Sequence, residues 1–285
     1  MELVDRIAAE RLRRMGFWSV RVPGPVGAHQ LYDGPGGGSL PTLVLLHGFS
    51  SRATHLVKLV PLLRGHFRRL VMPDLLGHGQ SDEPAPLASN HAISEAFFDM
   101  LDEVLDEPAV VFGNSLGGMF ALRYASRRPQ QVAGLLVTSP GGAPLPPEQQ
   151  AAFLQRFRPQ SLADARDLVD RAFAVSPRLA DLAARSLHKR MSAPTVQRLL
   201  DQMTHDDLLH PDELAAVRAP TCLLWGERER ILLPEHLAFF RAHLPAHAHI
   251  ERPAGYGHVP YFENAADLAA RIIAFAQQVD RRVAA

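Results

Sequence analysis

The chain of 285 residues has a single cysteine, no long apolar run and no excess of charge of either sign. One cysteine excludes an internal disulfide, and Cys222 falls in an apolar stretch, which favours a buried role over a nucleophilic one. Lys plus Arg and Asp plus Glu both number 30, so nothing in the charge balance favours nucleic acid or an acidic membrane surface as a partner. No stretch approaches the ~18 apolar residues of a membrane span, and the N-terminal residues lack the apolar core of a signal peptide. These absences predict a cytoplasmic protein.

Strand-like and helix-like patterns alternate along most of the chain, as they do in a doubly wound sheet. Strands are expected near 18–22, 28–32, 42–47, 69–73, 109–113, 132–138, 221–225 and 247–251. Helices are expected near 53–63, 91–105, 115–127, 235–243 and 264–278. Between about 143 and 218 the alternation stops, and the segments 162–173, 179–191 and 195–203 are helical in pattern with no strand between them. The sequence therefore predicts an α/β core domain (1–142 and 219–285) with a mostly parallel sheet of eight strands and a helical cap, or lid, inserted at 143–218.

The most informative motif is Gly-Asn-Ser-Leu-Gly at residues 113–117, which stands between the apolar run 109–112 and the helical pattern 119–125. A strand that enters a helix through so tight a turn forces Ser115 into a strained backbone conformation and exposes its hydroxyl. This pattern is typical of a nucleophile elbow, in which the amide of the next residue, Leu116, faces developing negative charge.

A serine nucleophile needs a second oxyanion donor, a base and a carboxylate that orients the base. The turn after the run 42–46 leaves the amide of Phe49 free to serve as the donor, whereas His47 at the strand end has the position of a structural histidine. His258 lies on a late glycine-rich loop, where the base of this architecture is expected. Two carboxylates, Glu227 and Glu229, follow the strand 221–225, and Glu229, deeper in the loop, is the preferred acid.

These motifs, in this order, resemble those of the α/β-hydrolase fold superfamily, in its lidded branch. The resemblance covers about residues 40–278, and it also rests on the segment Pro-Asp-Leu-Leu-Gly-His-Gly-Gln-Ser at 73–81. It departs at the acid, because members usually carry aspartate where Glu229 stands. The resemblance implies a serine hydrolase that cleaves a small carboxylic ester through an acyl-enzyme intermediate without a cofactor. The N-terminal helical pattern packs on the domain or on a second subunit, which leaves a homodimer open.

The cap is expected to shape the substrate pocket, with Phe153, Phe157, Phe173 and Met203 as candidate lining residues. A second enzymatic interpretation is carbon–carbon bond hydrolysis of ring-cleavage diketones. The Ser-Pro-Gly-Gly turn at 139–142 and Asn114 beside the nucleophile resemble that subfamily, in which a cap arginine binds substrate, here Arg185 or Arg190. Against it, Val259 follows the base where members usually have tryptophan. A ligand receptor built on the same fold is a third alternative.

Two groups of histidines invite interpretation as metal sites. These are the segment His-Asp-Asp-Leu-Leu-His at 205–210 and the group His243, His247 and His249. Neither has an established metal-ligand spacing, so the sequence predicts no metal site.

Overall fold

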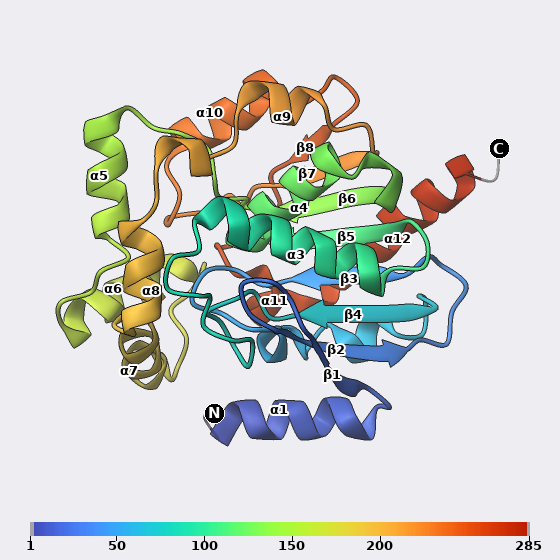
Figure 1. Ribbon diagram of the computed structural model, residues 1–285, viewed down its shortest axis with the longest axis horizontal. Helices are drawn as coiled ribbons and strands as arrows, with labels where there is room; N and C mark the ends of the chain where they lie inside the picture. The colour runs from blue at the N-terminus through green and yellow to red at the C-terminus, as the bar shows by residue number, and fades with distance from the viewer. Residues whose placement is uncertain (1–2, 284–285) are drawn as a thin grey trace.

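The computed structural model describes residues 3–283 as a twisted sheet of eight strands with helices on both faces (Figure 1). In spatial order the strands are β1-β2-β4-β3-β5-β6-β7-β8. The pairs β1–β2 and β2–β4 are antiparallel, and the other pairs are parallel. The strands are β1 (Trp18–Val22), β2 (His29–Pro35), β3 (Leu43–Leu46), β4 (Arg69–Pro73), β5 (Ala109–Asn114), β6 (Val132–Thr138), β7 (Thr221–Leu224) and β8 (His249–Glu251). This confirms the predicted α/β-hydrolase fold with a mostly parallel sheet.

Fifteen helical segments are assigned within residues 3–283. The α-helices are α1 (Leu3–Arg14), α2 (Val60–Leu63), α3 (Asn90–Val104), α4 (Leu116–Arg127), α5 (Pro147–Gln155), α6 (Leu162–Ala172), α7 (Ala180–Met191), α8 (Pro194–Asp201), α9 (Pro211–Ala215), α10 (Pro234–His243), α11 (Pro260–Glu263) and α12 (Ala265–Val283). The 3-10 helices are η1 (Ala53–Leu56), η2 (Pro129–Gln131) and η3 (His205–Asp207). None of these helices is both long enough and apolar enough to cross a membrane.

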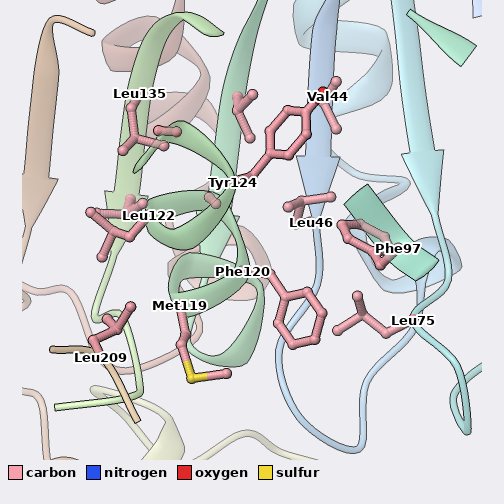
Figure 2. Packing of buried hydrophobic residues seen from close by; sticks show 14 of the residues in the cluster. Val44, Leu46, Leu75, Phe97, Met119, Phe120, Leu122, Tyr124, Leu135 and Leu209 are labelled. Atoms are coloured by element: carbon pink, nitrogen blue, oxygen red, sulfur yellow. The ribbon is translucent and has the colours of Figure 1, made fainter. Parts of the chain in front are cut away.

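The core forms two layers because successive side chains of a strand point to opposite faces of the sheet. Val44 and Leu46 of β3 belong to the cluster under α3 and α4, which includes Phe97, Phe120 and Tyr124 (Figure 2). Leu43 and Leu45 belong to the cluster on the other face, which α12 covers. Cys222 lies in this second cluster, and burial raises the pKa of its thiol to about 12, so the predicted buried role is confirmed.

The helical insertion lies between β6 and β7 and comprises α5 to α9 without a strand. Helices α5 to α8 lie at the end of the sheet where the parallel strands terminate, and α9 lies beside α10 (Figure 1). Helices α6, α7 and α8 match the predicted segments closely. The predicted helix 53–63 is wrong, because the chain forms two short pieces, η1 and α2. Helices α5, α9 and α11 were not predicted. Each begins at a proline, which interrupts a periodic pattern but suits the first turn of a helix.

Candidate active site

Ser115 occupies the one-residue turn between β5 and α4. Its φ of 53° and ψ of −116° lie outside the regions that L-residues favour, as the tight turn predicts. A Cβ added at Gly117 would lie 2.5 Å from the carbonyl oxygen of His47, so only glycine lets α4 approach β3 this closely. Ser115 itself is half-buried. The strand, the turn and the helix therefore hold its side chain at the carboxyl end of the sheet.

The loop after β3 runs directly against this turn. A Cβ added at Gly48 would lie 3.2 Å from Ser115 Cβ and 3.1 Å from Asn114 Oδ1. The next residue, Phe49, is thereby placed close to the serine. Leu116 is the first residue of α4, so its amide has no acceptor within the helix. The amides of Phe49 and Leu116 thus belong to the two backbone segments that meet at Ser115.

His47 has the structural role that its position predicts. Its ring is fully buried, with Nδ1 2.8 Å from the carbonyl oxygen of Gly48, and its Nε2 accepts a hydrogen bond of 3.1 Å from the amide of Leu75. One nitrogen donates while the other accepts, which is the pattern of a neutral imidazole. Burial lowers the pKa of His47 to about 3, so this histidine stays neutral and fixes the loop that precedes Phe49.

The predicted base and acid contact each other. Nδ1 of His258 lies 2.8 Å from Oε2 of Glu229, and the Glu229 and His258 side chains are 2% and 9% exposed. Glu227, the other candidate acid, is exposed instead. Of the two carboxylates in this loop, Glu229 is the one in contact with the imidazole.

Further hydrogen bonds hold Glu229 in its charged form. Its Oε1 accepts from the amides of Ile231 at 2.7 Å and Leu232 at 3.0 Å. Burial alone would raise the pKa of Glu229, but His258, the Ser139 hydroxyl and the Leu232 amide together lower it below the ordinary value. The charge is therefore retained in a buried position beside Nδ1 of His258.

Asn114 joins the serine turn to the loop that carries His258. Its side-chain amide donates to the backbone carbonyl of His258 at 2.8 Å and to Thr138 Oγ1 at 3.0 Å. Asn114 is fully buried, so it holds the backbone of the site together rather than lining a pocket as expected. Within residues 3–283 no hydrogen bond joins the Ser115 hydroxyl to the His258 ring. The Asn114 side chain instead ties the two loops together.

Aromatic side chains of α5 and the following turn reach the Phe49 loop. Phe157 packs edge-on against Phe49, with ring centroids 5.9 Å apart, and against Phe153 at 5.2 Å. Phe153 in turn lies 4.8 Å from the ring of His236 on α10. Phe49, Leu116 and Phe157 are partly buried against the same apolar cluster. These contacts place an apolar surface of the insertion beside Ser115.

The two candidate arginines of the insertion lie in different surroundings. Arg190 of α7 donates from Nε to the carbonyl oxygen of Ser50, at 2.8 Å, and also bonds the Ser186 hydroxyl. It therefore contacts the residue that follows Phe49. Arg185 is exposed on the same helix. Met203 is half-buried just after α8.

The end of α6 is fixed to both loops that carry the His258–Glu229 pair. The carbonyl oxygen of Ala172 accepts from the amides of His258 at 2.8 Å and Val259 at 3.3 Å. Arg230, next to Glu229 in the chain, donates to the carbonyl oxygen of Phe173 at 2.6 Å. The Phe173 ring stacks on Phe262, with centroids 5.9 Å apart. Phe173 and Val259, two predicted pocket residues, thus lie where the insertion meets these loops.

The contacts that Ser139 and Arg230 make at this site were not predicted from the sequence. Ser139 follows β6 directly, is buried, and has a φ of 40°, a conformation that favours glycine. The sequence did contain a signal for Ser139, because this residue directly follows a predicted strand and lies beside the glycines of 141–142. Arg230 gave no signal, because its acceptors are backbone carbonyls some sixty residues earlier in the chain.

Comparisons with known proteins agree with this architecture. A model of the Alpha/beta hydrolase family matches residues 43–271. The pimeloyl-[acyl-carrier protein] methyl ester esterase of Xanthomonas oryzae pv. oryzae (strain MAFF 311018) is 31% identical over 240 residues, which cover 79% of this chain and 90% of that protein. Among solved structures, naproxen esterase from Bacillus subtilis matches with a TM-score of 0.74 at 18% identity, covering 96% of this chain and 99% of the other. The meta-cleavage product hydrolase CumD of Pseudomonas fluorescens IP01 matches with a TM-score of 0.74 at 17% identity, covering 91% and 97%. The chain belongs to the alpha/beta hydrolase family.

Proposed function

We propose that this protein hydrolyses carboxylic esters through an acyl-enzyme intermediate, with Ser115 as nucleophile, His258 as base and Glu229 as the acid that orients it. The observation that carries the proposal is the buried pair of Glu229 and His258, 2.8 Å apart, on a loop that Asn114 joins to the strained turn of Ser115. A buried carboxylate on Nδ1 keeps the proton on that nitrogen and leaves Nε2 free to accept the serine proton. The esterase relative supports the same class of reaction.

The reaction proceeds in two halves. His258 Nε2 takes the proton of Ser115 as its oxygen attacks the ester carbonyl, and the amides of Phe49 and Leu116 donate to the resulting oxyanion. The imidazolium then protonates the leaving alcohol, and the acyl group remains on Ser115. In the second half His258 removes a proton from water, which attacks the acyl carbonyl, and the same proton returns to Ser115 as the acid leaves.

The insertion at 143–218 serves in this proposal as a lid over the nucleophile. Phe153 and Phe157 would line the acyl pocket, since Phe157 packs on Phe49, the proposed oxyanion donor. A small ester with an apolar acyl group fits such a wall. The chemistry needs no cofactor.

The test combines labelling and turnover. Wild-type protein should be labelled at Ser115 by a fluorophosphonate and should turn over p-nitrophenyl esters many times, whereas Ser115→Ala should lose both properties and stay folded by circular dichroism. Ser192→Ala, an exposed serine of the insertion, is the matched control and should keep both. Ester hydrolysis by Ser115→Ala at the wild-type rate would eliminate the proposal.

The same assay separates the two alternatives. A coloured ring-fission diketone, followed by its loss of absorbance, tests carbon–carbon bond hydrolysis. If that substrate has a kcat/KM above that of every ester in a series of increasing acyl length, the ester assignment is wrong. A receptor would bind an ester without multiple turnover.

A further inference from the structure

Two histidines and an aspartate meet where the insertion returns to the core. His205 and Asp206 belong to η3, and His210 precedes the first residue of α9. The potential ligand atoms of the three side chains all lie within 4.8 Å of one another. The rings of His205 and His210 meet edge to face, with centroids 5.6 Å apart. The spacing of these residues is not an established motif, so only the fold brings them together.

The backbone between these side chains is firmly held. The carboxylate of Asp207 accepts from the amide of Thr204 at 2.8 Å and from the side-chain amide of Asn90 at 3.2 Å. Arg123 of α4 donates to the carbonyl oxygen of Leu208 at 2.7 Å. The amide of Leu209 donates to the carbonyl oxygen of Gly142, at 2.8 Å. Contacts of the intervening residues thus fix the positions from which the three side chains project.

The three side chains lie at or near the surface of the protein. His205 and Asp206 are exposed and His210 is half-buried. Within residues 3–283 the Asp206 carboxylate makes no hydrogen bond or ion pair. Ligand atoms of a tetrahedral zinc ion, bound at about 2.0–2.2 Å, lie roughly 3.4 Å apart, so the three must approach by rotation of exposed side chains. The exposure of His205 and Asp206 leaves room for that movement.

We propose that His205, Asp206 and His210 bind one Zn²⁺ ion. Two neutral imidazoles and one carboxylate are the nitrogen and oxygen ligands that this borderline-soft ion takes in proteins, and water completes the fourth position. The site would connect η3 to the start of α9, next to the carbonyl oxygens of Asp207 and Leu208, which accept from Arg123 of helix α4. Bound zinc would stabilise the base of the insertion, because an ion that binds only the folded chain favours that state. The inference is independent of the proposed ester hydrolysis.

The experiment measures metal binding directly on the full-length protein, stripped of metal with a chelator. Calorimetric titration with Zn²⁺ should give one site per chain, and Co²⁺, used as a visible probe of the same site, should develop the d–d absorption of a tetrahedral complex. The melting temperature should rise with Zn²⁺ concentration. His205→Ala, His210→Ala and Asp206→Asn should each weaken Zn²⁺ binding by at least ~10–100-fold, the loss seen when even a supporting partner of a metal ligand is removed.

The control is His66→Ala, which removes an exposed histidine far from η3 in the sequence and should leave the affinity unchanged. The three ligand variants change exposed or half-buried side chains and should keep the metal-free melting temperature of the wild type. The proposal is overturned if wild-type protein takes up no stoichiometric Zn²⁺, or if His205→Ala binds the ion as tightly as His66→Ala. A ligand variant that fails to fold leaves the other two to decide.

Discussion

Replacing Glu229 by glutamine removes the charge beside His258 with little change in shape. Oε1 of Glu229 accepts from the amides of Ile231 and Leu232, so the glutamine must keep its carbonyl oxygen there. Its NH₂ group then faces Nδ1 of His258, at the place of the oxygen that lies 2.8 Å away in the wild type. The opposite orientation would turn the NH₂ group toward two amide donors and cost about 1–3 kcal/mol for each unsatisfied group.

A donor at Nδ1 forces the proton of the neutral imidazole onto Nε2. In the proposed mechanism Nε2 is the nitrogen that accepts the proton of Ser115, so the variant holds the wrong tautomer. The corresponding change in a Ser-His-Asp triad lowers kcat by about 10⁴-fold, which is about 5.5 kcal/mol of transition-state stabilisation. We expect a loss of that order for Glu229→Gln.

The assay is steady-state hydrolysis of a p-nitrophenyl ester. Glu227→Gln is the matched control, because it makes the same chemical change two residues earlier on an exposed side chain. The control should keep kcat within about twofold, since exposed charges contribute little. A kcat for Glu229→Gln within tenfold of the wild type, or a larger loss in Glu227→Gln, would refute the reasoning.

Three further changes test the site and its support. Asn114→Ala removes the donor to the His258 carbonyl, so it should lower the free energy of unfolding, measured by urea denaturation, by ~1–3 kcal/mol. It should also reduce kcat in the ester assay. Unchanged stability would contradict the role of Asn114. Phe157→Ala removes the ring that packs on Phe49, so the ratio of kcat/KM for long over short acyl chains should fall about tenfold. An equal loss of kcat/KM for all chain lengths would argue against a pocket role. His29 is buried, neither ring nitrogen has a partner among the described residues, and burial lowers its pKa to about 4. In the unfolded chain the histidine binds a proton near pH ~6.5, so acidification favours the unfolded state. His29→Phe should therefore reduce the fall in the free energy of unfolding between pH 7 and pH 5 by about 2 kcal/mol. An unchanged fall in the variant would contradict the low pKa of His29.

The elements that local patterns describe were predicted well. The eight strands and the turn at Ser115 follow from apolar runs, glycines and the order of motifs, all of which a linear sequence contains. The break of the helix at 57–59 and the short helices that begin at prolines were missed, because their lengths depend on packing rather than on periodicity. Boundaries of such short elements carry little sequence signal.

The contacts within the candidate site could be predicted only in part. The sequence narrowed the acid to two carboxylates, but the direction of each side chain depends on the fold of the loop, which turns Glu229 inward and Glu227 outward. The bond of Ser139 to Glu229 joins residues ninety positions apart. The spacing of the histidines at 205–210 matches no metal-binding motif and so predicts no site, although the fold brings the side chains of His205, Asp206 and His210 together.

The attachment of α6 to the loops of Glu229 and His258 limits how this protein could be redesigned. Exchanging residues 143–218 for the equivalent segment of a relative would alter substrate preference, and it would also replace the carbonyl group on which the amides of His258 and Val259 depend. A chimera that fails to supply an acceptor there would shift the imidazole away from the serine, whatever pocket it carried. Grafts that keep residues 170–175 and replace only the helices of the insertion that follow them retain this carbonyl acceptor.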